Sequence, residues 1–199
     1  HRLCEIVPYG NHAQKLVFQN SAVKLRRRDV LILALDNMNA SHFLMLPKLK
    51  HNSIINLHYL TSQPIFLPNG KSFMGVHGAQ FVQWLSVHQN VLSVTISFAN
   101  SIHLSDDELK REVWKEICLI RNVASAFVPP CRVLRFKRAT VALDAENVAR
   151  RPSSAQTLLD NVFVAGDWTM KNLPSSIETA ALSGKRAALQ AKKFFKSTS

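Results

Sequence analysis

The stretch of residues 161–195 constrains the fold of this chain more than any other part of its sequence. It opens with an apolar, β-rich run at residues 161–165, which leads directly into Gly166 and Asp167. A buried strand whose carboxyl end opens onto a ligand crevice typically has this pattern. We therefore expect a binding site at the end of this strand.

A helix is predicted after this turn. Ser175 is a favourable N-cap, and Glu178 completes a capping box. Mostly small residues then recur at helical spacing: Ile177, Ala180, Ala181, Gly184, Ala187, Ala188 and Ala191. Such a stripe allows close approach of the helix backbone, and the free N–H groups at the helix start favour an anionic or acceptor-rich ligand. The structural alternative is an alanine-rich helix that packs on a sheet, with Asp167 forming only a turn.

Several segments resemble a known flavin motif. Residues 164–169 (VAGDWT), residues 173–180 (LPSSIETA) and Ser183-Gly184 are similar to the carboxyl-terminal flavin motif of the amine oxidase and phytoene desaturase superfamily. Within it, they most resemble the squalene-associated desaturase branch, hydroxysqualene dehydroxylase. Residues 137–140 and the pair Arg151-Pro152 also match this branch.

The resemblance implies an FAD cofactor and assigns roles to the residues of the motif. Asp167 would hold a ribityl hydroxyl, and the backbone of Ser176 and Ile177 would meet the N1/O2 edge of the isoalloxazine. Leu173 and Pro174 would shape the loop over the ring. The implied cofactor-binding residues are Gly166, Asp167, Trp168, Leu173, Pro174, Ser175, Ser176, Ile177 and Ala180.

The resemblance also implies the fold class, α/β (α+β), and the domain organisation. Residues 1–50 would form part of the FAD-binding domain, residues 51–145 a substrate-binding domain with an antiparallel sheet and one helix, and residues 146–199 the carboxyl-terminal FAD-binding segment. The residue pattern agrees with this organisation. Residues 30–35 have the continuous apolar character of a buried parallel strand, and the alternating segments within 53–100 predict an antiparallel sheet with one solvated face.

Three shorter elements can be placed from local signals. A helix is predicted at residues 39–46, before Pro47, and a strand at residues 81–85. Ser105 and Glu108 form a second capping box, with acidic residues in the first turn of the helix that they begin.

The amino-terminal half of a flavin site is not found in the sequence. Flavoproteins of this class bind the ADP half of FAD through a Rossmann βαβ unit with the motif G-x-G-x-x-G, which none of the six glycines forms. The chain also begins with His1 instead of Met. We therefore expect the carboxyl-terminal piece of a longer enzyme, or a split or decayed gene product that needs a partner chain.

Charge limits the classes of partner. The chain has 25 Lys and Arg against 13 Asp and Glu, a formal net charge of +12, which suits nucleic acid or an anionic membrane surface. The basic residues are scattered and no nucleic-acid motif accompanies them, so we expect no nucleic acid and instead peripheral membrane contact. No apolar run is long enough to predict a transmembrane helix.

Cysteine and histidine usage argues against other classes of site. The three cysteines are odd in number and lack metal-type spacing, which favours a reducing, cytoplasmic setting. Together with the basic surface, we expect a cytoplasmic protein with peripheral contact at the inner face of the membrane. The eight histidines show no pairing at three or four residues, so no metal site is expected.

The function implied is that of an FAD-dependent oxidoreductase acting on a long isoprenoid small molecule. By resemblance to hydroxysqualene dehydroxylase, the reduced flavin would deliver a hydride to an allylic carbon as a hydroxyl leaves, which forms squalene for hopanoid synthesis. Carotenoid (phytoene) desaturation or amine oxidation is the first alternative, and a non-catalytic scaffold that keeps the fold is the second. No side chain can be assigned as catalytic, and we expect the chain to be inactive without its amino-terminal half.

Overall fold

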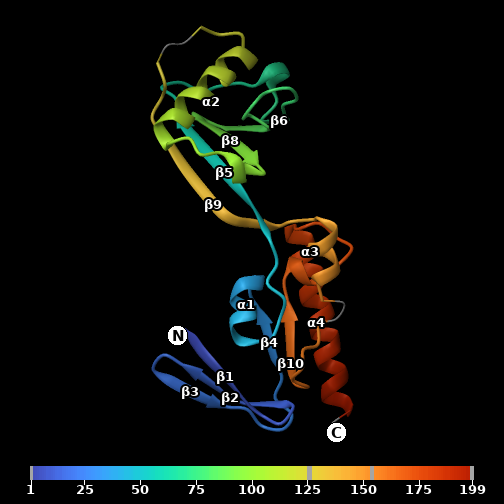
Figure 1. The fold of residues 1–199 in the computed structure, drawn as a ribbon. Coiled ribbons are helices and arrows are strands. Elements are labelled where there is room, and N and C mark those ends of the chain that lie inside the picture. Colours follow the sequence, from blue (N-terminus) through green and yellow to red (C-terminus); the bar gives the residue numbers. More distant parts are fainter. Residues whose placement is uncertain (1, 125–126, 153–154, 198–199) are drawn as a thin grey trace. The chain divides into compact units, whose positions relative to one another are not determined.

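The computed structural model of this chain describes residues 2–124, 127–152 and 155–197 (Figure 1). The chain divides into two compact units. Unit 1 combines His1–Lys50 with Val141–Ser199, and unit 2 is the continuous segment His51–Thr140. Among the helices of the described ranges, none has both the length and the apolar character needed to cross a bilayer.

Unit 1 begins with a three-stranded antiparallel sheet. β1 (Leu3–Tyr9) pairs with β2 (His12–Phe18), and β2 pairs with β3 (Ser21–Lys24). Ile6 of β1 lies opposite Leu16 of β2, and both side chains are buried in the largest hydrophobic cluster of unit 1. One face of this sheet therefore packs against the rest of the unit.

A parallel pair of strands, β4 (Leu31–Ala34) and β10 (Val162–Ala165), forms the centre of unit 1. They pair in register along their whole length. All four residues of β10 are buried, as expected for a continuous apolar run in a parallel sheet. The strands predicted at residues 30–35 and 161–165 are confirmed.

A short helix follows β4. α1 spans Asn37–Phe43, and the Asp36 carboxylate accepts a hydrogen bond from the N–H of Asn39 at 3.0 Å. The helix predicted at residues 39–46 is therefore present but starts and ends earlier than expected, because Asp36 already acts as its N-cap.

Two more helices complete unit 1. α3 spans Ala145–Arg150, and the carboxylate of Asp144 caps it by accepting the N–H of Asn147 at 2.8 Å. α4 spans Ile177–Ser197 and packs on β10. The buried residues of this contact are Ala155, Phe163, Ala165, Ala187 and Ala191.

Asn161 joins the antiparallel sheet of unit 1 to the parallel pair. Its side chain is fully buried, accepts the N–H of Ala13 at 2.8 Å, and donates to the carbonyls of Ala13 and Asp29 at 3.0 and 3.2 Å. Buried amides need such partners, because an unmade hydrogen bond in the interior is costly. The start of β10 is thus fixed by a polar side chain as well as by packing.

Unit 2 consists of a five-stranded sheet covered on one face by a helix (Figure 1). The strands, in spatial order, are β6 (Phe73–Gly75), β7 (Trp84–His88), β8 (Val91–Ser97), β5 (His51–Leu60) and β9 (Cys131–Val141). The covering helix, α2 (Asp106–Ile120), contributes Leu109, Val113, Trp114 and Ile117 to the core. Short 3-10 turns of unit 2 lie at Pro68–Gly70 and Ala99–Ser101, and a further one, Asp167–Thr169, belongs to unit 1.

The other face of this sheet is more polar. Buried and half-exposed residues alternate along β8, which confirms the prediction of one solvated face. On that face, His58 Nδ1 lies 2.8 Å from the Oγ of Ser93, its partner in register. Phe73 and Trp84, both exposed, stack at the sheet edge with ring centroids 5.2 Å apart.

Both ends of the predicted capping box of α2 are confirmed. Ser105 Oγ accepts the N–H of Glu108, and the Glu108 carboxylate accepts the N–H of Ser105 at 2.9 Å. Further along the helix, Glu116 accepts the backbone N–H groups of residues 80–82 at 2.7 to 3.2 Å. The strand predicted at residues 81–85 therefore starts only at Trp84, because the amides before it bind a helix carboxylate instead of a strand.

We expect Glu116→Ala to lower the free energy of unfolding by about 2–3 kcal/mol, because hydrogen bonds to a charged acceptor are strong and three amides would lose theirs. Urea unfolding followed by circular dichroism measures this. Glu112→Ala is the matched control: it lies one turn earlier on α2 and forms only a surface ion pair with Lys115. Equal losses from the two substitutions would contradict the role given to Glu116.

Candidate functional site

The carboxyl ends of β4 and β10 form the candidate site. Ala34 and Ala165 are partners at the last position of the register, so the segments that leave the two strands begin side by side. Asp36 follows one strand and Asp167 the other. In open α/β sheets, ligands bind at the carboxyl ends of neighbouring parallel strands, at the point where the segments that follow the two strands diverge.

Gly166 forms the turn at the end of β10. Its N–H donates to Ser183 Oγ of α4 at 2.8 Å. A Cβ added at this position would lie 2.6 Å from Cδ1 of Trp168 and 3.1 Å from the Leu35 carbonyl oxygen. Only glycine therefore allows β10, α4 and the turn to lie so close together.

Trp168 is directed into the core, although the resemblance places it among the cofactor-binding residues. Its side chain is 1% exposed, and its indole N–H donates to the Leu35 carbonyl at 2.8 Å. The ring packs with Leu33 and Val164 in the largest cluster of unit 1. The Trp168 side chain thus anchors the turn in the core of unit 1.

Asp167 differs from its neighbours in that its carboxylate accepts no hydrogen bond from any residue that the structure describes. The side chain is half-exposed. Asp36 lies at the equivalent place after β4, and both of its carboxylate oxygens accept hydrogen bonds from Asn39. Asp167 is therefore the acceptor at this strand end that remains available for hydroxyl donors of a ligand.

Arg151 holds the loop that follows Asp167. Its guanidinium donates to the carbonyls of Trp168 and Leu173, both at 3.0 Å, and of Asp167 at 2.5 Å. The residue is 2% exposed. Burial lowers the pKa of the Arg151 guanidinium, and the nearby Asp167 carboxylate acts in the opposite direction.

A second arginine supports the same loop from α4. Arg186 donates to the Thr169 carbonyl at 2.6 Å, and Thr169 Oγ1 donates to the Gly166 carbonyl at 2.8 Å. Burial lowers the pKa of Arg186. Sequence reasoning missed both arginines as site residues. For Arg151, the available signal was the match of Arg151-Pro152 to the flavoprotein branch.

The capping box predicted for α4 is wrong by one residue. Ser176 is the cap, because its Oγ accepts the N–H of Thr179 at 3.1 Å. Ser175 Oγ instead accepts the N–H of Val141 at 3.2 Å, which ties the start of α4 to the end of β9. Hydrogen bonds from its own backbone N–H and from Ser176 lower the pKa of Glu178.

The predicted small-residue stripe of α4 is correct only in part. The helix buries Thr179, Ser183, Ala187 and Ala191, a row at a spacing of four. Ala180, Ala181 and Ala188 are exposed, and Ile177 is 86% exposed. The side of α4 that the stripe predicts to be covered is therefore largely exposed.

The remaining predicted residues gather around this loop. Arg151 brings the carbonyls of Asp167 and Leu173 to one guanidinium, so the two ends of the loop lie close together. Leu173 is half-buried, and Pro174 is exposed. Ser176 and Ile177 follow at the start of α4. The arrangement offers one free carboxylate, a glycine that permits close approach and a helix N-terminus, which suits a ligand with hydroxyl groups and partial negative charge.

Comparison with known proteins adds a family match to this geometry. Residues 1–191 match the family described as flavin containing amine oxidoreductase. The chain is 37% identical over 196 residues to a hydroxysqualene dehydroxylase of Rhodopseudomonas palustris, which covers 94% of the chain and 44% of that protein. The hydroxysqualene dehydroxylases of Zymomonas mobilis and Sinorhizobium fredii are 34% and 31% identical, again over 94% of the chain.

This chain spans less than half the length of these relatives, 44% to 45%. Among solved structures, tryptophan halogenase from Shewanella frigidimarina aligns with a TM-score of 0.48 at 14% identity. That alignment covers 100% of this chain and 35% of the halogenase.

Gly166→Ala should destabilise unit 1, because the new methyl group would overlap the Trp168 ring and approach the Leu35 carbonyl. We expect a loss of about 1–3 kcal/mol in the free energy of unfolding. Gly184→Ala is the matched control. Nothing lies within 4 Å of its added Cβ, so this variant should gain about 0.5–1 kcal/mol from helix propensity. The same sign of change in both variants would refute the close packing at Gly166.

Arg151→Lys should weaken the hydrogen bonding of the loop after Asp167. An ammonium group cannot reproduce the planar guanidinium that donates to three carbonyls at once. We expect a loss of about 2–4 kcal/mol in the free energy of unfolding, together with a red shift of Trp168 fluorescence in a background that carries both Trp84→Phe and Trp114→Phe. Arg150→Lys is the control, since the adjacent Arg150 only pairs with Glu146 at the surface. If both lysine variants behave alike, Arg151 does not organise the loop.

Proposed function

Because this chain belongs to the flavin containing amine oxidoreductase family, we propose that it supplies the ribityl- and ring-facing half of an FAD site. The whole enzyme would act on a long isoprenoid, as the name of its hydroxysqualene dehydroxylase relatives indicates for them. The observation that carries the proposal is the turn at Gly166 and Asp167. There a side chain larger than hydrogen would clash, and the Asp167 carboxylate, which accepts no hydrogen bond from the described residues, lies at the end of a buried parallel strand.

The residues present fit such a cofactor. Asp167 would accept a hydrogen bond from a ribityl hydroxyl. The first turn of α4, at Ser176 and Ile177, would place a positive dipole end near the part of the ring that gains negative charge on reduction. The flavin, when bound, supplies hydride transfer. The protein binds and orients it, and Arg151 fixes where Asp167 stands relative to Leu173.

An isoprenoid substrate is proposed over an amine because the relatives that this chain matches are named hydroxysqualene dehydroxylases. An aromatic pair beside the flavin would favour an amine substrate, and Trp168 was the aromatic residue of the motif that could contribute to one. Its ring is buried in the core of unit 1 and donates to the Leu35 carbonyl.

An amino-terminal half, in the same protein or in a partner chain, would complete the site. Within the described residues, β4 pairs only with β10, so its other edge carries no strand. Parallel sheets are normally covered on both faces and contain more than two strands. Ile32 of β4 is 38% exposed. We propose that a strand of the dinucleotide-binding half pairs with this edge.

Co-expression with the amino-terminal half of a hydroxysqualene dehydroxylase should yield a complex that copurifies with flavin and absorbs near ~450 nm. Asp167→Ala should lower the FAD affinity of this complex by about 10–100-fold, the loss expected for a charged hydrogen bond. Asp160→Ala is the matched control, because Asp160 is exposed and lies before β10, not after it. A complex that contains no flavin, or an equal loss of FAD affinity in both variants, would contradict the FAD proposal. Conversion of hydroxysqualene, assayed separately against phytoene and an amine, tests the substrate class.

A further inference from the structure

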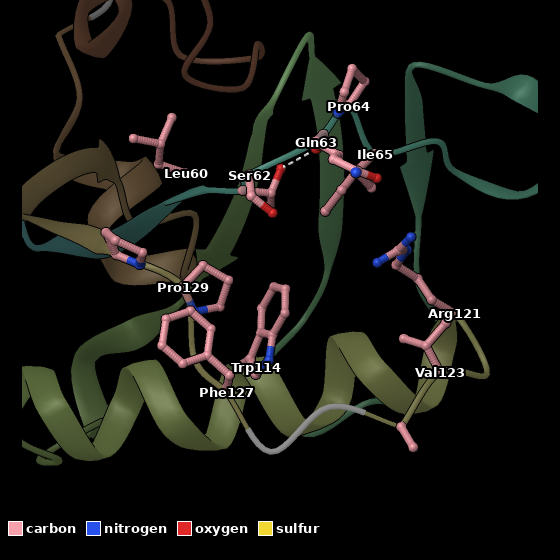
Figure 2. Close-up of a pocket in the computed structure, with 13 residues that line it drawn as sticks. Leu60, Ser62, Gln63, Pro64, Ile65, Trp114, Arg121, Val123, Phe127 and Pro129 are labelled. Atoms are coloured by element: carbon pink, nitrogen blue, oxygen red, sulfur yellow. Dashed lines mark hydrogen bonds between the residues drawn. The ribbon is translucent and has the colours of Figure 1, made fainter.

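Unit 2 contains a pocket that the proposed flavin site does not use. It lies between the end of β5, the carboxyl end of α2 and the segment that leads into β9 (Figure 2). Its volume is about 590 Å³, within the range of small-molecule sites. None of the residues of the flavin motif lines it.

Most of the lining is apolar. Figure 2 shows the rings of Trp114, Phe127 and Pro129 on one side of the pocket and Val123 with Arg121 on the other. Phe127 is 72% exposed, and Leu60, at the same mouth, is 51% exposed. Clustered exposed apolar side chains around a concavity commonly mark a binding site.

The charge of the pocket is of one sign. Arg121 is the charged residue among those lining the pocket, and no acidic residue accompanies it. Arg121 makes no ion pair with any residue in the described ranges. Trp114, also in the lining, has a buried indole N–H without an acceptor there. The charged part of the lining is therefore positive, and no acidic residue lines the pocket.

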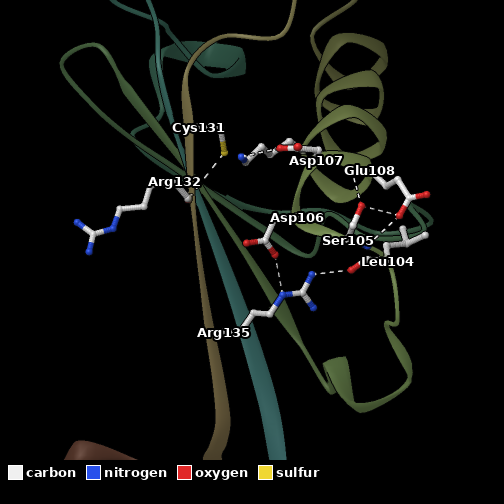
Figure 3. A network of polar contacts seen from close by, with 9 residues as sticks. Leu104, Ser105, Asp106, Asp107, Glu108, Cys131, Arg132 and Arg135 are labelled. Atoms are coloured by element: carbon white, nitrogen blue, oxygen red, sulfur yellow. Dashed lines mark hydrogen bonds and ion pairs between the residues drawn. The ribbon is translucent and has the colours of Figure 1, made fainter.

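Three cations close to α2 differ from Arg121 in that they are held in ion pairs. Arg135 donates to the Asp106 carboxylate at 2.9 Å and to the Leu104 carbonyl at 2.8 Å (Figure 3). On α2, Lys110 pairs with Asp107 and Lys115 pairs with Glu112. Arg121 stands at the C-cap of α2, where its charge also suits the helix dipole.

We propose that this pocket binds an amphipathic anion. Its hydrocarbon chain would lie against Trp114 and Phe127, and its oxyanion would pair with Arg121. The isoprenoid of the proposed reaction carries a hydroxyl group and no charge, so this ligand differs from that substrate and the inference goes beyond the proposed function. A long-chain carboxylate and an anionic phospholipid of a membrane surface share the required chemistry.

Quenching by dibrominated stearate tests the pocket directly, because bromine atoms quench tryptophan only at close range. The test uses the 199-residue chain with Trp84→Phe, which keeps Trp114 and the buried Trp168. We expect saturable quenching. Arg121→Gln should weaken the apparent affinity by about tenfold or more, through the loss of a charge-assisted contact. Phe127→Ser should weaken it through lost apolar contact.

Two matched controls separate the pocket from general adsorption. Phe98 has the same exposed fraction as Phe127, 72%, but does not line the pocket. Arg132 is an exposed arginine of β9 that is also outside the lining. Phe98→Ser and Arg132→Gln should bind dibrominated stearate as the parent chain does. Circular dichroism checks that each variant is folded.

Vesicle co-sedimentation identifies the source of the ligand. Binding to vesicles of phosphatidylcholine with phosphatidylglycerol, but not of phosphatidylcholine alone, and its loss in Arg121→Gln, would support a membrane lipid. Binding of stearate without vesicle binding would support a free carboxylate. Absence of both, or equal weakening by the pocket variants and their controls, would overturn the proposal.

Discussion

The loop between β10 and α4 depends on one buried cation. The Arg151 guanidinium donates to the carbonyls of Asp167, Trp168 and Leu173, and without it the loop would lose three hydrogen bonds to a charged donor. Because its bonds reach both ends of the loop, one side chain determines where the free carboxylate stands relative to the start of α4. Arg186 of α4 donates to a fourth carbonyl of the loop, that of Thr169. The proposed cofactor contacts rest on this arrangement.

Elements with a strong local signal could be predicted from the sequence. The parallel strands were visible as apolar runs, and Gly166 with Asp167 marked the strand end at which the candidate site lies. The start of α4 was predicted one residue early, because Ser175 and Ser176 are equally good caps in isolation. The Ser175 hydroxyl accepts a hydrogen bond from the backbone N–H of Val141, which is distant in sequence. Ser176 therefore caps the helix instead.

Local sequence signals do not predict which face of α4 is buried, nor that Arg151 lies in the interior. Alanines on the two sides of α4 look alike in sequence, and only the row from Thr179 to Ala191 at a spacing of four indicates the covered side. In a chain with 25 lysines and arginines, an arginine is expected at the surface. Arg151 is buried because tertiary folding brings three carbonyls to it, which no local pattern encodes. The hydrogen bonds of Glu116 and Asn161 could not be predicted for the same reason, because their partners lie far away in sequence.

The discontinuity of unit 1 has a consequence for the order in which the chain folds during synthesis. β4 leaves the ribosome long before β10, its parallel partner, and the whole of unit 2 is made between them. Unit 2 is continuous, so it can close as soon as it has emerged. The apolar strand β4 has to wait without that neighbour until the last part of the chain arrives, and during this interval it is the segment most exposed to mispairing and to chaperone binding.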